Sequence, residues 1–127
     1  IGLAEKIDRI CKEKHKKQRI YLQLNTGADP NKHGILVKNA NYAAQEITKM
    51  DNLILEGIMT ISPMDVSTIK LSSIYRKTRE VGDEIHIKIN NKCKNISMGM
   101  SNDYEIAIAE GATHIRIGTG LFGPRPE

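Results

Sequence analysis

The sequence predicts an α/β fold in which parallel strands alternate with helices that cover them. Several short runs of residues along the 127-residue chain are apolar at successive positions, as expected for strands that are buried on both faces. Segments with apolar residues at helical spacing separate these runs, and the connections are short and rich in Gly, Asn, Asp and Pro. Strand–helix alternation of this kind is typical of a parallel sheet. The four expected strands would make a small open sheet or half of a β/α barrel.

The N-terminal part is expected to hold two helices and one strand. Apolar residues at helical spacing predict a first helix that runs to about residue 17, and the apolar segment 20–24 reads as a short buried strand. Residues 25–34 form a loop rich in turn-forming residues. A second helix is expected over 36–50, where Leu and Ala recur on one face.

The middle of the chain repeats this order. Residues 53–61 are almost all apolar and predict a strand, which Ser-Pro ends. A third helix starts near Ser67 or Thr68. Residues 84–90 alternate Ile with polar residues, as a strand would, but we expect the helix to continue because the strand–helix order is otherwise regular.

The C-terminal part is expected to add two strands and a short helix. Residues 96–98 predict a short strand, and 102–110 predict a compact helix that Gly111 ends. Residues 112–117 are expected to form the last strand. The tail from residue 120 to 127, with two prolines, is expected to be a loop or the start of a final helix.

Composition and charge indicate a soluble cytoplasmic protein without a nucleic-acid or membrane partner. The net charge is +4, and no aromatic side chains interleave with the main cationic cluster, so a solvated helix end explains the cluster better than base stacking does. Cys11 and Cys93 have no ligand-spaced partners, which argues against a disulfide or zinc site and for a reducing compartment. The chain has no signal peptide and no 18-residue apolar run. The cationic cluster consists of Lys12, Lys14, His15, Lys16, Lys17 and Arg19.

The histidines do not suggest a metal site. His33, His86 and His114 are too scattered along the chain to form a ligand set by spacing. His33 and Lys32 belong to the 25–34 loop, which would place them near the mouth of a strand-end site. A solvated turn explains these two residues equally well.

Two turns that combine glycine with a hydroxyl group predict a phosphate cradle. The first runs from Ser97 to Ser101 and the second is Gly118-Thr119-Gly120, each at the end of an expected strand. Glycines let backbone N–H groups approach an oxyanion, and the hydroxyl groups of Ser101 and Thr119 can add donors. Adjacent strands lie about 4.8 Å apart, so both turns could hold one phosphate. The first turn also admits a simpler reading, in which Asn102 and Glu105 form a capping box for the next helix.

Further candidates for the site lie at the same edge of the expected sheet. Asn25 and Met59 are expected at one level, at the ends of the first two strands. Met59, Met98 and Met100 could line a flat apolar slot for a ring, although methionines are more often plain core filler.

Arg116 is the most informative charge in the sequence. It lies between Ile115 and Ile117, near the end of a strand that is expected to be buried, so its guanidinium needs a partner. Two readings remain open: a structural ion pair with a strand-end acid, or a donor directed into the strand-end pocket.

Several of these segments together carry a family resemblance. They include Ser-Met-Gly-Met-Ser-Asn-Asp at 97–103 and Arg-Ile-Gly-Thr-Gly-Leu-Phe-Gly at 116–123, and also 25–27, 32–34, 55–61 and 107–112. With these motifs the chain resembles the pyridoxal-phosphate homeostasis proteins, the YggS/PROSC family of the alanine-racemase-barrel type. The resemblance extends over essentially the whole chain.

The resemblance implies a fold, a cofactor and residue roles. Such proteins are single (β/α)8 barrels of the TIM type that hold pyridoxal 5′-phosphate (PLP) on a Schiff-base lysine in the N-terminal half. By resemblance, Ser101, Gly118 and Thr119 would bind the phosphate, and Arg116 would face the pyridine nitrogen and disfavour its protonation. The implied function is that of a non-catalytic PLP carrier in intracellular PLP homeostasis, without enzyme activity.

The chain resembles only the C-terminal half of that barrel and starts inside the fourth helix. The covalent lysine is therefore expected in the N-terminal half, and a half-barrel is expected to pair with that half or with another chain because it exposes two sheet edges. Two alternatives are a racemase-like enzyme of the same barrel class and a barrel fragment that binds a phosphate ligand without PLP. Racemases of this class draw a tyrosine base from an extra C-terminal β-domain, whereas this chain ends soon after Phe122-Gly123, as the stand-alone family does.

Overall fold

The computed structural model of the chain describes residues 1–30 and 33–123. Lys32 and the end of the predicted tail, residues 124–127, lie outside the described residues. The elements follow one another as α1 (Gly2–Glu13), β1 (Gln18–Leu24), η1 (Val37–Asn39), α2 (Ala40–Thr48), β2 (Leu53–Thr60), α3 (Thr68–Lys88), β3 (Asn95–Ser97), α4 (Tyr104–Ala109) and α5 (Thr119–Phe122).

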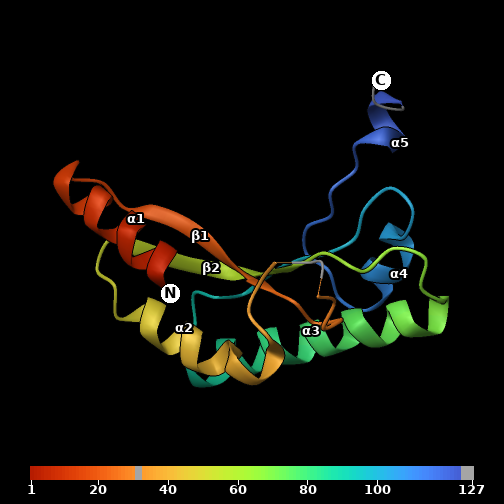
Figure 1. Cartoon of the computed structure of the whole chain (residues 1–127), viewed down its shortest axis with the longest axis horizontal. Coiled ribbons are helices and arrows are strands. Elements are labelled where there is room, and N and C mark those ends of the chain that lie inside the picture. Colours follow the sequence, from red (N-terminus) through yellow and green to blue (C-terminus); the bar gives the residue numbers. More distant parts are fainter. Residues whose placement is uncertain (31–32, 124–127) are drawn as a thin grey trace.

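The strands form one parallel sheet in the order β1-β2-β3. Helices α2 and α3 lie along one side of this sheet (Figure 1). The core is packed between the sheet and these helices, because alternate strand residues point to that side. The predicted parallel sheet with alternating helices is therefore confirmed. The largest fully buried side chains of the core are Leu24, Leu55, Ile58, Tyr75, Ile85 and Met98.

The expected fourth strand, 112–117, is not a strand in the structure. Its backbone runs beside β3 and makes one isolated parallel bridge, between Ser97 and His114. The bridge consists of the hydrogen bonds from His114 N to Ile96 O at 3.1 Å and from Met98 N to His114 O at 3.0 Å, and a bond from Arg116 N to Gly99 O at 2.9 Å continues the contact. The ladder cannot extend because β3 has only three residues and the chain turns at Gly99, whose φ is +101°.

Helix α3 follows the prediction closely. It continues to Lys88, so the ambiguous Ile-rich segment is helical up to that residue. Its N-cap is Ser67, whose hydroxyl accepts a hydrogen bond from Lys70 N at 3.2 Å. None of the helices in the described part of the chain is long and apolar enough to cross a membrane.

Several helix ends differ from the prediction, and α2 covers only Ala40–Thr48 of the expected 36–50. Helix α1 ends at Glu13, four residues before the expected Lys17, because His15 adopts a left-handed conformation with φ of 53°. The N-cap of α4 is Asp103, and no side chain caps that helix. The predicted capping box of Asn102 and Glu105 is therefore wrong.

Gly57 allows β2 and β3 to approach closely. A Cβ atom at this position would lie 2.3 Å from the carbonyl oxygen of Asn95. On the other side of β2, the register with β1 shifts, since Ile20 pairs with Leu55 and Tyr21 pairs with Gly57. This irregularity leaves Glu56 as an extra residue in β2.

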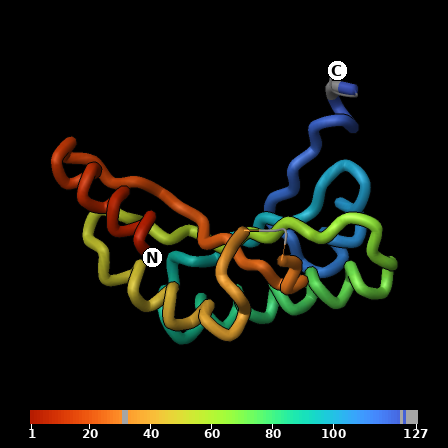
Figure 2. The backbone as a smooth tube through the Cα atoms, in the orientation of Figure 1, coloured from red at the N-terminus to blue at the C-terminus, as the bar shows by residue number. Residues whose placement is uncertain are grey.

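The C-terminal segment stands clear of the sheet. Figure 2 traces it in blue away from the rest of the chain, with the N-terminal helix at the other end of the molecule. Tyr21, Gln23 and Met59 are half-buried and alternate with core residues of β1 and β2, so they point to the side of the sheet opposite α2 and α3, here called the open side.

Candidate functional site

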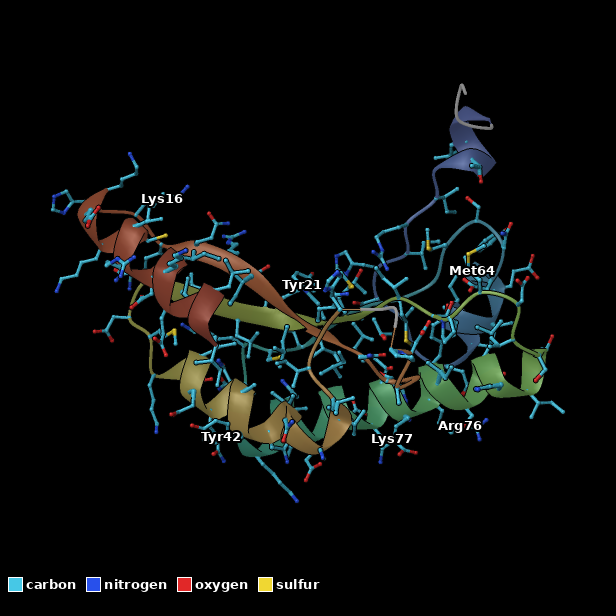
Figure 3. The ribbon with its side chains drawn as sticks, in the orientation of Figure 1. Lys16, Tyr21, Tyr42, Met64, Arg76 and Lys77 are labelled. Atoms are coloured by element: carbon cyan, nitrogen blue, oxygen red, sulfur yellow. The ribbon has the colours of Figure 1, made fainter. Side chains whose placement is uncertain are left out.

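A cavity of about 340 Å³ lies on the open side of the sheet. Figure 3 shows Tyr21 near the middle of the molecule, on the opposite side of the strands from Lys77 of α3. Met59 pairs with Ser97 of β3, so these two residues share one level of the sheet and one face. The cavity is lined by Tyr21, Met59, Ser97, His114, Ile115 and Arg116.

Arg116 gives the cavity its unpaired donor. One terminal nitrogen, Nη2, donates to the carbonyl oxygen of Thr60 at 3.1 Å, which places the guanidinium at the carboxyl end of β2. Its Nε is buried and has no hydrogen-bond partner. Among the residues that the structure describes, no carboxylate lies within 4.0 Å of this side chain. Among the described residues the ion-pair reading is thus not supported, and the Nε of Arg116 has no hydrogen-bond partner in the protein.

An aromatic pair forms another wall of the cavity. The rings of Tyr21 and His114 meet edge to face, with centroids 6.1 Å apart and planes at 80°. The Tyr21 hydroxyl accepts a hydrogen bond from Asn95 Nδ2 at 3.1 Å, and His114 Nδ1 lies 2.9 Å from the Thr113 hydroxyl. Each ring is therefore oriented by a contact with a polar side chain.

The two glycine–hydroxyl turns are in direct contact, as the sequence predicts. Gly120 N donates to Ser101 Oγ at 3.0 Å, across eighteen intervening residues of chain. The space around Gly118 is open, since a Cβ atom there would meet nothing within 4 Å. An open backbone beside a fixed hydroxyl can accommodate an anion.

Not every predicted site residue lines the cavity. Met59 and Arg116 do, whereas Ser101, Gly118 and Thr119 lie outside its lining, in the neighbouring turns. Met98 is fully buried in the core, and Met100 is about half exposed, at 47%. The slot of three methionines is thus reduced to Met59.

Asn25 is placed differently from the prediction. It follows Leu24, which pairs with Thr60, whereas Met59 pairs with Gln23, so Asn25 and Met59 are not at one level. Its side chain bonds within its own loop: Nδ2 donates to Asp29 O at 2.8 Å, and Oδ1 accepts from Asp29 N at 3.0 Å. These contacts shape the loop after β1.

Sequence reasoning did not predict four of the lining residues as site residues: Tyr21, Ser97, His114 and Ile115. The alternation within residues 20–24 carries a signal for Tyr21, because it lies on the face opposite the apolar Leu22 and Leu24. No comparable signal exists for His114, because its place depends on the single bridge beside β3. Within residues 1–30 and 33–123, no group of three His, Cys, Asp or Glu side chains could hold a metal ion.

Residues 2–126 match the protein family described as the N-terminal domain of alanine racemase. The chain belongs to this family. Within it, the chain groups with the pyridoxal phosphate homeostasis proteins, because its curated relatives carry that name.

The sequence relatives are about twice as long as this chain. It is 35% identical over 124 residues to the pyridoxal phosphate homeostasis protein of Aquifex aeolicus, and the match covers 98% of this chain and 54% of that protein. The corresponding protein of Synechocystis sp. is 34% identical over 125 residues, with 98% and 57% covered. The chain therefore spans about half the length of the curated relatives it matches. These relatives are named for homeostasis of the cofactor and not for a reaction.

Solved structures support the same relationship. PipY of Synechococcus elongatus, without PLP, superimposes with a TM-score of 0.89 at 32% identity, over 96% of this chain and 57% of PipY. PipY with PLP bound gives a TM-score of 0.84 at 28% identity, over the same shares. The alanine racemase of Clostridium difficile shares the fold alone, with a TM-score of 0.73 at 22% identity, over 99% of this chain and 33% of the racemase. The three parallel strands thus match part of an alanine-racemase-like barrel.

Proposed function

We propose that this chain is the PLP-binding C-terminal half of a barrel protein that maintains the cytoplasmic supply of PLP and carries the cofactor without catalysis. The observation that carries the proposal is the buried Nε of Arg116, which has no partner and belongs to a residue lining a cavity. The names of the curated relatives, and the PLP bound to PipY, support PLP as the ligand.

The residues present fit the two ends of PLP. Met59 and the edge-to-face pair of Tyr21 and His114 offer apolar and aromatic walls for a ring, and Arg116 offers a cation to its nitrogen. For the phosphate we propose Ser101 and the backbone of Gly118-Thr119, which combine a hydroxyl with open glycine backbone. Met100 and Asn25 are proposed at the edge of the site.

The charge of Arg116 agrees with the proposed role as a carrier that does not catalyse a reaction. PLP serves as an electron sink when its ring nitrogen is protonated. A guanidinium held at that nitrogen disfavours the added proton, because two positive charges would then face each other. Arg116 would therefore bind and orient the ring while keeping it a poor electron sink.

The proposed assignment to the C-terminal half rests on strand number and motif order. A closed barrel of this type has eight strands, whereas the described part of this chain supplies three strands, with isolated bridges at Ile35 and His114. The outer edge of β1 and the open face of the sheet would then meet the other half of the barrel, or another chain, and the covalent lysine would come from that half.

Replacing Arg116 tests the proposal. In the full-length protein that this chain is proposed to belong to, we expect Arg116→Gln to stay folded and to weaken PLP binding about ten- to a hundredfold, the range for loss of one hydrogen bond to a charged group. Equilibrium dialysis against PLP measures the affinity, and circular dichroism measures folding. Arg9→Gln is the matched control, because Arg9 is exposed on α1, far from the cavity in sequence and in the fold.

Two outcomes would contradict the proposal. Unchanged PLP affinity in a folded Arg116→Gln variant would show that Arg116 does not contribute to PLP binding. Binding of a sugar phosphate as tightly as PLP, with equal affinities in the wild type and in Arg116→Gln, would favour a phosphate-binding fragment that does not recognise the ring.

A further inference from the structure

One carboxylate joins three separate parts of the chain beside the proposed phosphate site. Asp103 Oδ1 accepts a hydrogen bond from Met100 N at 2.8 Å. Asp103 Oδ2 accepts two more, from the Tyr75 hydroxyl at 2.8 Å and from the Ser62 hydroxyl at 3.1 Å. Because an ionised carboxylate is only an acceptor and has room for several donors, it satisfies all three groups at once.

The donors come from elements that are rigid or fixed in place. Tyr75 lies in α3 and is only 1% exposed, so its hydroxyl has one position. Ser62 follows the end of β2, whose last residue, Thr60, also binds Arg116. Asp103 is thus anchored to the helix layer and to the strand end.

These hydrogen bonds fix the loop of residues 99–103, which carries Ser101. At one end of the loop, Gly99 O accepts from Arg116 N at 2.9 Å. At the other end, Asp103 holds Met100 N directly. Ser101 lies between these two anchors, and its Oγ contacts Gly120 N. The loop has no other side-chain anchor among the described residues.

Tyr75 remains a hydrogen-bond donor over the whole physiological range. Burial of its ring raises the pKa of Tyr75 to about 12, and the neighbouring Asp103 carboxylate raises it as well. The Tyr75 hydroxyl therefore keeps its proton at neutral pH and remains a donor to Asp103.

We propose that Asp103, held by Tyr75, is a positioning residue that sets the preference of the site for a phosphorylated ligand, because it fixes the loop that presents Ser101. This inference rests on the proposed function. Asp103 touches no ligand in this scheme and acts through Ser101 alone.

The test compares PLP with pyridoxal, which lacks the phosphate. We expect Tyr75→Phe and Asp103→Ala each to lower the ratio of PLP affinity to pyridoxal affinity about tenfold, with pyridoxal affinity unchanged. Equilibrium dialysis with each compound gives both affinities. Tyr42→Phe is the matched control, because it removes the bond from another tyrosine to a carboxylate, Glu46, at 3.3 Å on the exposed face of α2.

A second comparison separates positioning from general support of the fold. In a Ser101→Ala background, Tyr75→Phe should not change the PLP-to-pyridoxal ratio further, because the group through which it acts is gone. Equal losses for both compounds, an unchanged ratio in folded Tyr75→Phe, or a full further loss in the Ser101→Ala background would each overturn the inference. If the ratio stays constant in Tyr75→Phe while Arg116→Gln weakens PLP, only this inference fails. A wild type that does not prefer PLP would overturn the proposed function as well.

Discussion

The fold treats the charges of Tyr75, Cys93 and Arg116 differently. Tyr75 and Cys93 are buried, whereas Arg116 is half-buried and only its Nε is enclosed. Tyr75 is 1% exposed and Cys93 is 2% exposed, and both remain neutral because burial disfavours their anions. Burial raises the pKa of Cys93 to about 11. Arg116 cannot lose its charge in this way, since a guanidinium stays protonated. A partly unpaired cation next to a cavity therefore points to a ligand more strongly than either neutral group does.

The raised pKa values of Tyr75 and Cys93 predict a loss of stability at high pH. A raised pKa in the folded state means that the stabilisation is complete below the ordinary pKa and is lost as pH rises through the folded value. For Cys93 this window runs from its ordinary value of 9.0 to about 11. We expect the free energy of unfolding to fall over this window by about 2–3 kcal/mol more in the wild type than in Cys93→Ala. Urea titrations between pH 8 and 11 measure the free energy of unfolding of both proteins. The same pH dependence in the wild type and in Cys93→Ala would contradict the prediction.

The elements show where sequence patterns carry structural information and where they do not. Helix α3 could be predicted because its apolar face, from Ile74 to Ile85, keeps helical spacing over several turns. The segment 112–117 contains Ala112, Ile115 and Ile117, but strand formation also depends on a partner, and β3 offers only three residues. The N-cap of α4 also escaped prediction, because Asp103 bonds to Tyr75 and Ser62, which are distant in sequence.

The close pairing of β2 with β3 predicts that a larger residue at Gly57 strongly destabilises the protein. A methyl group added there would lie 2.3 Å from Asn95 O, so Gly57→Ala must separate the two strands. We expect a loss of about 3 kcal/mol in the free energy of unfolding, the upper part of the range for overpacking. Gly2→Ala is the control, because a Cβ atom there meets nothing within 4 Å. Urea denaturation of both variants checks the prediction, and equal stabilities would refute it.

At the scale of the whole molecule, the site depends on register as much as on motifs. Met59 and Arg116 could be chosen from the sequence, because each stands near a strand end in a recognisable segment. Tyr21 could not be matched to His114 in advance, since their contact requires the shifted β1–β2 register and the bridge at Ser97. The sequence predicted the kind of fold and the family, while the walls of the cavity required the three-dimensional structure.

The proposed division of the barrel into two halves predicts that no particular lysine of this chain forms a covalent bond with PLP. We expect borohydride reduction of the chain mixed with PLP to leave no single lysine labelled in preference to the others, because the covalent lysine is proposed to lie in the other half. Peptide mass spectrometry locates the label, and a full-length relative treated in parallel serves as the control. Stoichiometric labelling of one lysine in this chain would show the division to be wrong.

The order of the strands has a consequence for synthesis on the ribosome. The sheet grows as β1, β2 and β3 in chain order, so each strand can pair with one that has already emerged. His114, Ile115 and Arg116 are translated after all three strands and α3, yet they supply half of the residues that line the cavity. A nascent chain therefore has no complete cavity until Arg116 leaves the exit tunnel, even though the sheet that carries Tyr21, Met59 and Ser97 can already have formed.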